Sequence, residues 1–137
     1  MAKILVIDDE PALRNILRLT LERAGHEVLE APDGEVGTRI LSTEKLDLLI
    51  TDIVMPNKDG IGTIREARTA DPDLKIIAIS GGGHNSGELD YIELAQKLGA
   101  DRAYRKPFKP NEIAAAVDEL LKPAEDSPLT PAGRKAS

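Results

Sequence analysis

The sequence contains no cysteine, and aromatic residues make up only 2% of its 137 residues, with one Phe, two Tyr and no Trp. Without cysteine the chain can form neither disulfides nor thiolate metal sites, and it gives no sign of an oxidising compartment. Its formal net charge is -6. An acidic surface with few aromatic rings offers neither counterion release nor base stacking, so we expect no direct binding of nucleic acid.

Long apolar runs are missing as well. None approaches the length of a bilayer span, and the N-terminus lacks the basic segment and extended apolar block of a signal peptide. These absences predict a cytoplasmic protein without membrane contact. A chain of this size buries roughly two thirds of its unfolded surface, which is sufficient for one domain with a core.

Short aliphatic runs recur along the chain and predict five strands. They are KILVI (3–7), EVLEA (27–31), DLLIT (47–51), KIIAI (75–79) and, with the weakest pattern, DRAYR (101–105). Three of these runs, 3–7, 47–51 and 75–79, do not alternate apolar with polar residues. That pattern is typical of strands covered on both faces.

Apolar residues at helical spacing follow each strand and predict five helices. The stripes are Leu13, Ile16, Leu17, Leu21 and Ala24; Val36, Ile40 and Leu41; Ile61, Ile64 and Ala67; Leu89, Ile92, Ala95 and Leu98; and Ile113, Val117, Leu120 and Leu121. Strand and helix therefore alternate five times, which predicts an α/β fold with a parallel sheet and helices on both faces. The Pro-rich segment 123–137 predicts a disordered tail or linker after a domain over 1–122.

Acidic residues stand where two of the predicted strands end. Asp8 and Asp9 follow the first strand and Asp52 follows the third. Because ligands of open parallel sheets bind at the carboxyl ends of the strands, these carboxylates converge if the two strands are neighbours. Their mutual repulsion then favours a bound cation, and oxygen ligands without His or Cys favour Mg²⁺. The alternative is that Asp9 or Glu10 caps the next helix and Asp52 begins a turn.

A hydroxyl and an ammonium follow two further strand ends. Ser80 follows the fourth strand and Lys106 follows the fifth. Taken singly, Ser80 before Gly81 is typical of a turn and an isolated lysine is typically solvated. Beside an acidic metal site, however, the pair supplies what an anionic group with several oxygens needs.

These motifs together resemble the receiver domain of two-component response regulators. The matching segments are VIDDE (6–10), ITDIVMPNKDG (50–60), AIS (78–80) and GADRAYRKPF (99–108), and the resemblance covers residues 2–122. It implies a flavodoxin-like, doubly wound sheet of strand order 2-1-3-4-5. The family is one of phosphorylated switches and not of turnover enzymes.

Each site residue receives a role from this resemblance. Asp52 resembles the phosphoacceptor, and Asp8, Asp9, Asp52 and the backbone carbonyl of Val54 resemble the Mg²⁺ ligands. Lys106 would pair with a phosphoryl oxygen, and Ser80 would hydrogen-bond another. The peptide bond between Lys106 and Pro107 is expected to be cis.

The resemblance also implies partners, namely a sensor histidine kinase or histidine phosphotransfer protein and an unknown downstream protein, with the chain a monomer or weak homodimer. Without an effector domain, the chain is expected to be a stand-alone receiver, a phosphorelay intermediate or a fragment ending in a linker. Two alternatives remain open, a phosphate-independent scaffold of the same fold and an aspartyl-phosphate phosphohydrolase. The hydrolases fit less well, because their nucleophile normally follows the first strand.

One position departs from the family pattern. The usual switch aromatic lies three residues before the lysine, where this chain has Ala103, and Tyr104 comes one step later. Since neighbouring strand residues point to opposite faces, Tyr104 cannot take over that position. His26 and His84 are expected to be exposed polar residues without a metal or phosphotransfer role.

Overall fold

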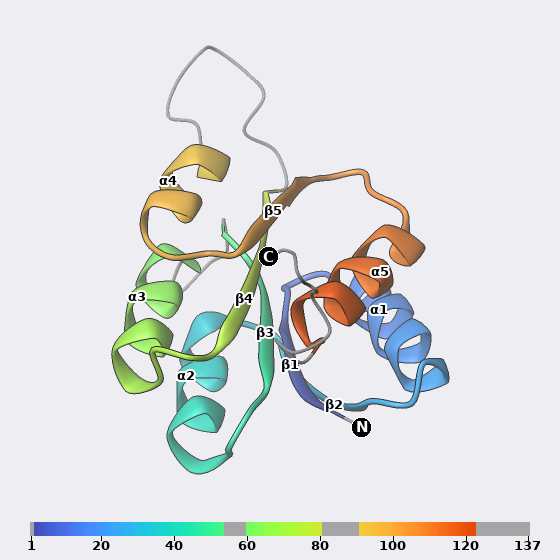
Figure 1. Ribbon diagram of the computed structural model, residues 1–137, viewed down its shortest axis with the longest axis horizontal. Helices are drawn as coiled ribbons and strands as arrows, with labels where there is room; N and C mark the ends of the chain where they lie inside the picture. The colour runs from blue at the N-terminus through green and yellow to red at the C-terminus, as the bar shows by residue number, and fades with distance from the viewer. Residues whose placement is uncertain (1, 54–59, 81–90, 123–137) are drawn as a thin grey trace, which may run out of the picture.

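The protein is described by a computed structural model over residues 2–53, 60–80 and 91–122. In this part of the chain five strands alternate with five helices (Figure 1). The strands are β1 (Lys3–Ile7), β2 (Glu27–Ala31), β3 (Leu48–Asp52), β4 (Lys75–Ser80) and β5 (Arg102–Arg105). The helices are α1 (Pro11–Arg23), α2 (Gly34–Thr43), α3 (Gly60–Ala70), α4 (Tyr91–Lys97) and α5 (Pro110–Leu120).

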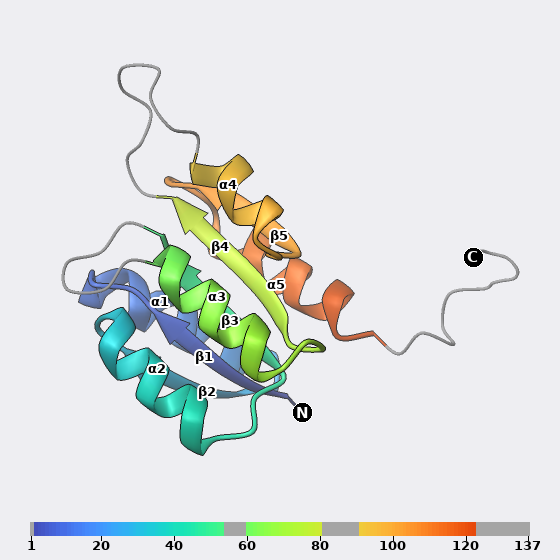
Figure 2. The ribbon, with the colours of Figure 1, turned by 90° about the vertical axis from the view of Figure 1, so that its left-hand side faces the viewer.

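The strands form one parallel sheet in the order β2-β1-β3-β4-β5, which confirms the predicted flavodoxin-like topology. Helices α1 and α5 cover one face, and α2, α3 and α4 cover the other (Figure 1). Ile7 pairs with Thr51, and Asp52 pairs with Ile79, so the carboxyl ends of the three central strands lie at one rim. Figure 2 shows the strands β1 and β4 pointing toward this same end of the molecule.

The central strands are covered on both faces, as their unbroken apolar runs predicted. All five residues of β3 are buried. In β1, Ile4 and Val6 pack with the α1 and α5 layer, whereas Leu5 and Ile7 pack with the layer of α2, α3 and α4. The sheet therefore lies between two apolar clusters and holds its strand ends firmly in register. Across the described ranges, no helix has the length and apolar content to cross a membrane.

The strand and helix boundaries require small corrections. Asp52 and Ser80 are the last residues of β3 and β4 and not the first residues of the following loops.

Ile16 is 44% exposed, so its assignment to the buried stripe of α1 was wrong. It precedes the fully buried Leu17 by one residue, which turns it by about 100° around the helix, away from the sheet.

The expectation for His26 was also wrong, because only 12% of its side chain is exposed. Its Nδ1 accepts a hydrogen bond from the backbone N–H of Ala2 at 3.3 Å, which draws the ring against the start of β1. Several of the sequence features singled out above lie outside the described residues, namely Val54, Gly81, His84, Leu89 and the segment 123–137. The side chain of Ile92 does so too.

A close approach between α2 and β1 depends on a glycine. A Cβ at Gly37 would collide with Cδ1 of Ile7 and lie 2.9 Å from its Cγ1. Ile7 is fully buried and cannot move toward solvent. The absence of a side chain at this position therefore sets how closely α2 packs on the sheet.

We expect Gly37→Ala to destabilise the protein by about 1 to 3 kcal/mol, because overpacking a buried contact outweighs the roughly 1 kcal/mol that alanine contributes to helix propensity. Urea denaturation gives the free energy of unfolding of each variant. Ile7→Val removes the colliding methyl, so the two substitutions together should cost less than the sum of the single costs. Strict additivity would show that the clash is not the cause.

Candidate functional site

Three carboxylates meet at the rim where β1 and β3 end. Asp8 and Asp9 follow β1 directly, and Asp52 is the last residue of the neighbouring β3. One carboxylate oxygen from each lies within 4.8 Å of the others. Asp8 and Asp52 are buried, at 1% and 2% exposure, whereas Asp9 is exposed. Charged groups this deeply buried require a partner of opposite charge.

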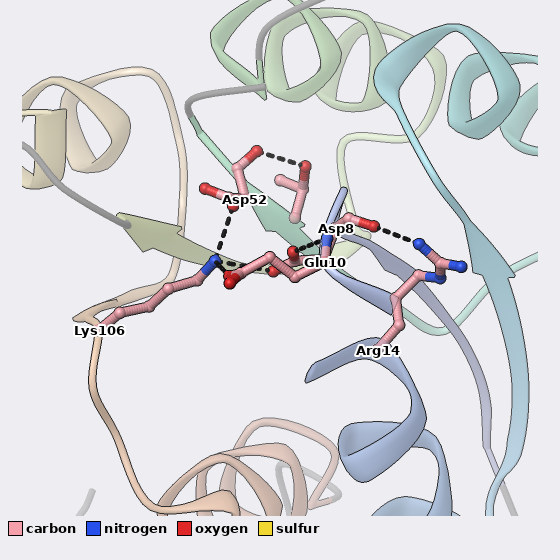
Figure 3. Close-up of polar contacts among 6 residues, drawn as sticks. Asp8, Glu10, Arg14, Asp52 and Lys106 are labelled. Atoms are coloured by element: carbon pink, nitrogen blue, oxygen red, sulfur yellow. Dashed lines mark hydrogen bonds and ion pairs between the residues drawn. The ribbon is translucent and has the colours of Figure 1, made fainter. Parts of the chain in front are cut away.

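Hydrogen bonds to the backbone and the side chain of Asp8 hold the turn from β1 into α1. The N–H of Asp8 donates to the carbonyl of Ala31 at 3.2 Å, and the N–H of Glu10 donates to Asp8 Oδ1 at 2.8 Å. Arg14 Nη1 donates to the carbonyl of Asp8 at 2.7 Å (Figure 3). In the Asp8 carboxylate, Oδ1 is thus bound to the turn, and Oδ2 lies 3.2 Å from the Lys106 ammonium.

Lys106 brings the positive charge to this cluster. Its Nζ lies 2.9 Å from Asp52 Oδ2, 2.6 Å from Glu10 Oε1 and 3.2 Å from Asp8 Oδ2 (Figure 3). The backbone N–H of Lys106 donates to the carbonyl of Ser80 at 2.9 Å, which ties the residue to the end of β4. The peptide bond between Lys106 and Pro107 is cis, as expected.

Burial and charge act in opposite directions on the two central groups. Burial raises the pKa of Asp8 above its ordinary value, against the lowering effects of the Glu10 N–H and the Lys106 ammonium. For Lys106 burial lowers the pKa, but the hydrogen bonds from its ammonium to Glu10 and Asp52, with their charges and that of Asp8, raise it overall. The lysine therefore stays protonated, and a single ammonium faces more negative charge than it neutralises.

The donor set fits a small hard cation. Asp8 Oδ2 is buried and, among the described residues, receives no hydrogen bond, although it lies 3.2 Å from the Lys106 ammonium. Such an oxygen beside two further carboxylates is suited to coordinate a metal ion. Oxygen ligands with no His or Cys among them match Mg²⁺, so the acidic triad is consistent with the Mg²⁺ site of receiver domains. Val54 lies outside the described residues.

Ser80 ends β4 and is 2% exposed. Strand register places it beside Arg105, one residue before Lys106. The structure thus brings Asp8, Asp9, Asp52 and Lys106 into one cluster and places Ser80 at the strand end next to it.

Three contacts of this site were not anticipated from the sequence. Glu10 occupies the N-cap position of α1, but its side chain makes no capping hydrogen bond and pairs with Lys106, so the capping interpretation was wrong for Glu10. Arg14 supports the Asp8 carbonyl, and the Thr51 hydroxyl donates to the carbonyl of Asp52 at 3.0 Å. The acidic run offered a signal for Glu10. Nothing in the sequence distinguishes Arg14 or Thr51 from other polar residues.

Ala103 and Tyr104 point to opposite faces of β5, as the strand period predicted. Ala103 packs with the layer of α2, α3 and α4, whereas Tyr104 packs with the layer of α1 and α5. The tyrosine therefore cannot occupy the space beside Ala103.

Residues 4–118 match the family model of the response regulator receiver domain. The chain belongs to this family. The receiver domain is 37% identical over 123 residues to the alkaline phosphatase synthesis transcriptional regulatory protein PhoP of Bacillus subtilis, covering 90% of this chain and 50% of that protein. It is also 37% identical over 122 residues to the transcriptional regulatory protein CpxR of Klebsiella pneumoniae, covering 89% and 50%. The chain thus spans about half the length of the curated relatives it matches.

Solved structures share the architecture. A response regulator receiver domain protein from Clostridium thermocellum is 35% identical with a TM-score of 0.79, covering 88% of this chain and 94% of that chain. The response regulator TrrA of Thermotoga maritima, determined in complex with Mg²⁺ and BeF, is 33% identical with a TM-score of 0.75, covering 88% and 100%. The receiver domain described here therefore has close structural counterparts along nearly their whole length.

In the receiver domain without divalent ions, we expect Asp8→Asn to raise the free energy of unfolding at pH 7 by about 1 kcal/mol, the size of a typical single-residue effect. A raised pKa means that the folded state prefers the neutral carboxyl. The charged form therefore destabilises the fold above the raised pKa. This cost disappears as the pH falls toward 3.8, which is the ordinary pKa of the carboxyl and applies in the unfolded chain.

Urea denaturation in EDTA at several pH values measures this effect. The advantage of Asp8→Asn should shrink below the raised pKa, because Asp8 of the wild type is then neutral too. Asp73→Asn, at an exposed carboxylate, serves as the control and should change stability little at any pH. A loss of stability in Asp8→Asn at pH 7 would contradict the expectation.

Proposed function

We propose that this receiver domain accepts a phosphoryl group on Asp52 in a Mg²⁺-dependent reaction and signals through protein contacts. The observation that supports the proposal is the position of the Asp52 carboxylate, which lies at the carboxyl rim of the sheet in contact with the Lys106 ammonium at 2.9 Å. The acidic triad around it supports metal-assisted chemistry.

The donor is a phosphohistidine of a sensor histidine kinase or histidine phosphotransfer protein, or a small phosphodonor. A carboxylate oxygen of Asp52 attacks the phosphorus, and a new P–O bond forms as the P–N bond to the histidine breaks. The histidine nitrogen keeps the bonding electron pair and, because the other ring nitrogen carries a proton, leaves as neutral imidazole. The product is an acyl phosphate on Asp52.

The surrounding residues supply charge and hydrogen bonds to the transferred group. Lys106 pairs with one phosphoryl oxygen, and the Ser80 hydroxyl donates to another. Asp8, Asp9, Asp52 and the Val54 carbonyl would hold Mg²⁺, whose charge offsets that of the phosphoryl oxygens. Arg14 keeps the Asp8 backbone in place for this purpose.

The outcome of the reaction is a switch and not turnover. We propose a cytoplasmic receiver domain over 1–122, followed by a tail or linker, that acts as a phosphorylated switch or a phosphorelay intermediate. Its downstream partner is a protein, and the chain is a monomer or weak homodimer. This chain has Ala103 where the family usually has the switch aromatic. Phosphorylation is therefore coupled to the partner-binding surface without an aromatic side chain at position 103.

Incubation with acetyl phosphate and Mg²⁺ should add the mass of one phosphoryl group to the intact wild-type chain, and Asp52→Asn should abolish the addition. EDTA should abolish it in the wild type as well, because the charge of the phosphoryl oxygens is then not offset. Intact-mass spectrometry measures both effects, with Asp73→Asn as the control that retains phosphorylation.

Undiminished addition in Asp52→Asn would overturn the proposed role of Asp52. Binding of a downstream protein that is insensitive to Asp52→Asn would favour a phosphate-independent scaffold. Steady release of phosphate from a metabolite over many turnovers would favour a phosphohydrolase.

A further inference from the structure

The third carboxylate on Lys106 comes from a residue that is outside the metal-binding triad. We propose that Glu10 is a positioning residue for Lys106, holding its ammonium in the resting state and yielding it when an anion arrives at Asp52. Glu10 thereby sets how tightly the site takes up a phosphoryl group. This inference rests on the proposed function.

The three partners of Lys106 differ in their access to water. Its distance to Glu10 Oε1, 2.6 Å, is the shortest of the three. The side chain of Glu10 is 60% exposed, whereas those of Asp8 and Asp52 are only 1% and 3% exposed. Glu10 therefore approaches the ammonium from the solvent side, and the two aspartates approach it from the protein side.

The position of Glu10 is built into the fold. Its backbone N–H is bound to Asp8 Oδ1, and the side chain does not cap α1. The close-up view shows the Glu10 side chain extending across the rim to the end of Lys106, next to Asp52 (Figure 3). The residue is thus anchored at the acidic turn, with its carboxylate directed at the lysine.

The Lys106 ammonium donates hydrogen bonds to Glu10 and Asp52, and it forms an ion pair with Asp8 at 3.2 Å. A phosphoryl group on Asp52 brings further negative charge and competes with these carboxylates for the ammonium. Asp8 is buried, so releasing it from the ammonium would return no carboxylate to water. Releasing Glu10 costs little, because its carboxylate returns to water. Glu10 is therefore the partner that is displaced, and its attraction for the ammonium opposes anion uptake.

Glu10→Gln tests this competition, since it keeps the side-chain length and an acceptor oxygen but removes the charge. We expect beryllofluoride, used as the phosphoryl mimic, to bind about three- to fivefold more tightly to this variant at saturating Mg²⁺, in line with the strength of an exposed ion pair. Isothermal titration calorimetry on the full chain measures the dissociation constant. Saturation with Mg²⁺ is checked separately for each variant.

The matched control is Glu119→Gln. Glu119 is 58% exposed and pairs with Arg102 at 2.8 Å, so it resembles Glu10 in exposure and pairing but lies near the C-terminal end of α5. Its substitution should leave the dissociation constant unchanged. An equal gain in both variants would show that overall charge, and not the contact with Lys106, governs anion uptake, and would overturn the inference.

Glu10→Asp separates the contact from the local charge. An aspartate keeps the charge but is one methylene shorter, and at an N-cap position its carboxylate is drawn to the N–H groups of the first helical turn. We expect this variant to bind beryllofluoride more tightly than the wild type, as Glu10→Gln does. Binding no tighter than that of the wild type, in either Glu10→Gln or Glu10→Asp, would overturn the inference.

Failure of this inference can be distinguished from failure of the proposed function. If the wild type takes up neither beryllofluoride nor a phosphoryl group, or if Asp52→Asn retains uptake, the proposed function fails and the inference fails with it. If the wild type passes these tests and Glu10→Gln does not bind more tightly, only the role of Glu10 is rejected.

Discussion

A single ammonium set against several carboxylates is the interaction on which the site of this protein depends. Asp8 and Asp52 are almost completely buried, and the Lys106 ammonium lies within 3.2 Å of both. Because burial alone would favour the neutral acids, the lysine is what allows carboxylates to persist at the rim. Its charge is still smaller than theirs. The excess negative charge therefore favours binding of a cation beside the carboxylates, and the ammonium favours binding of an anion beside the lysine.

The sheet makes this arrangement possible. β1 and β3 are neighbours with parallel register, and both are packed from two sides by apolar residues, so their ends cannot shift independently. A second close approach adjoins the site, where a Cβ at Gly60 would collide with the carbonyl of Asp52. The start of α3 thus lies against the end of β3. Because the strands are tightly packed, the side chains at their ends are held in fixed positions.

The exposed and buried members of the cluster have different uses. Buried Asp8 and Asp52 carry the chemistry because their positions and charges are constrained, whereas exposed Glu10 can exchange the ammonium for water at small cost. The family relationship accounts for the shared features of the site. The Glu10 contact and the small side chain of Ala103 are properties of this chain itself. The first affects how tightly the site binds a phosphoryl group, and the second affects how phosphorylation is coupled to the protein surface.

The sequence by itself determined the fold class and the chemical types at the rim, since strands covered on both faces leave unbroken apolar runs and the acids follow them directly in the chain. It also indicated that Ala103 and Tyr104 face opposite ways, because strand periodicity is local. Only the tertiary structure decided that Glu10 pairs with Lys106 and does not cap α1, that Arg14 supports Asp8, and that Ile16 is exposed. These outcomes depend on which partner a side chain meets across the fold, and local sequence patterns carry no information about a contact between residues 96 positions apart.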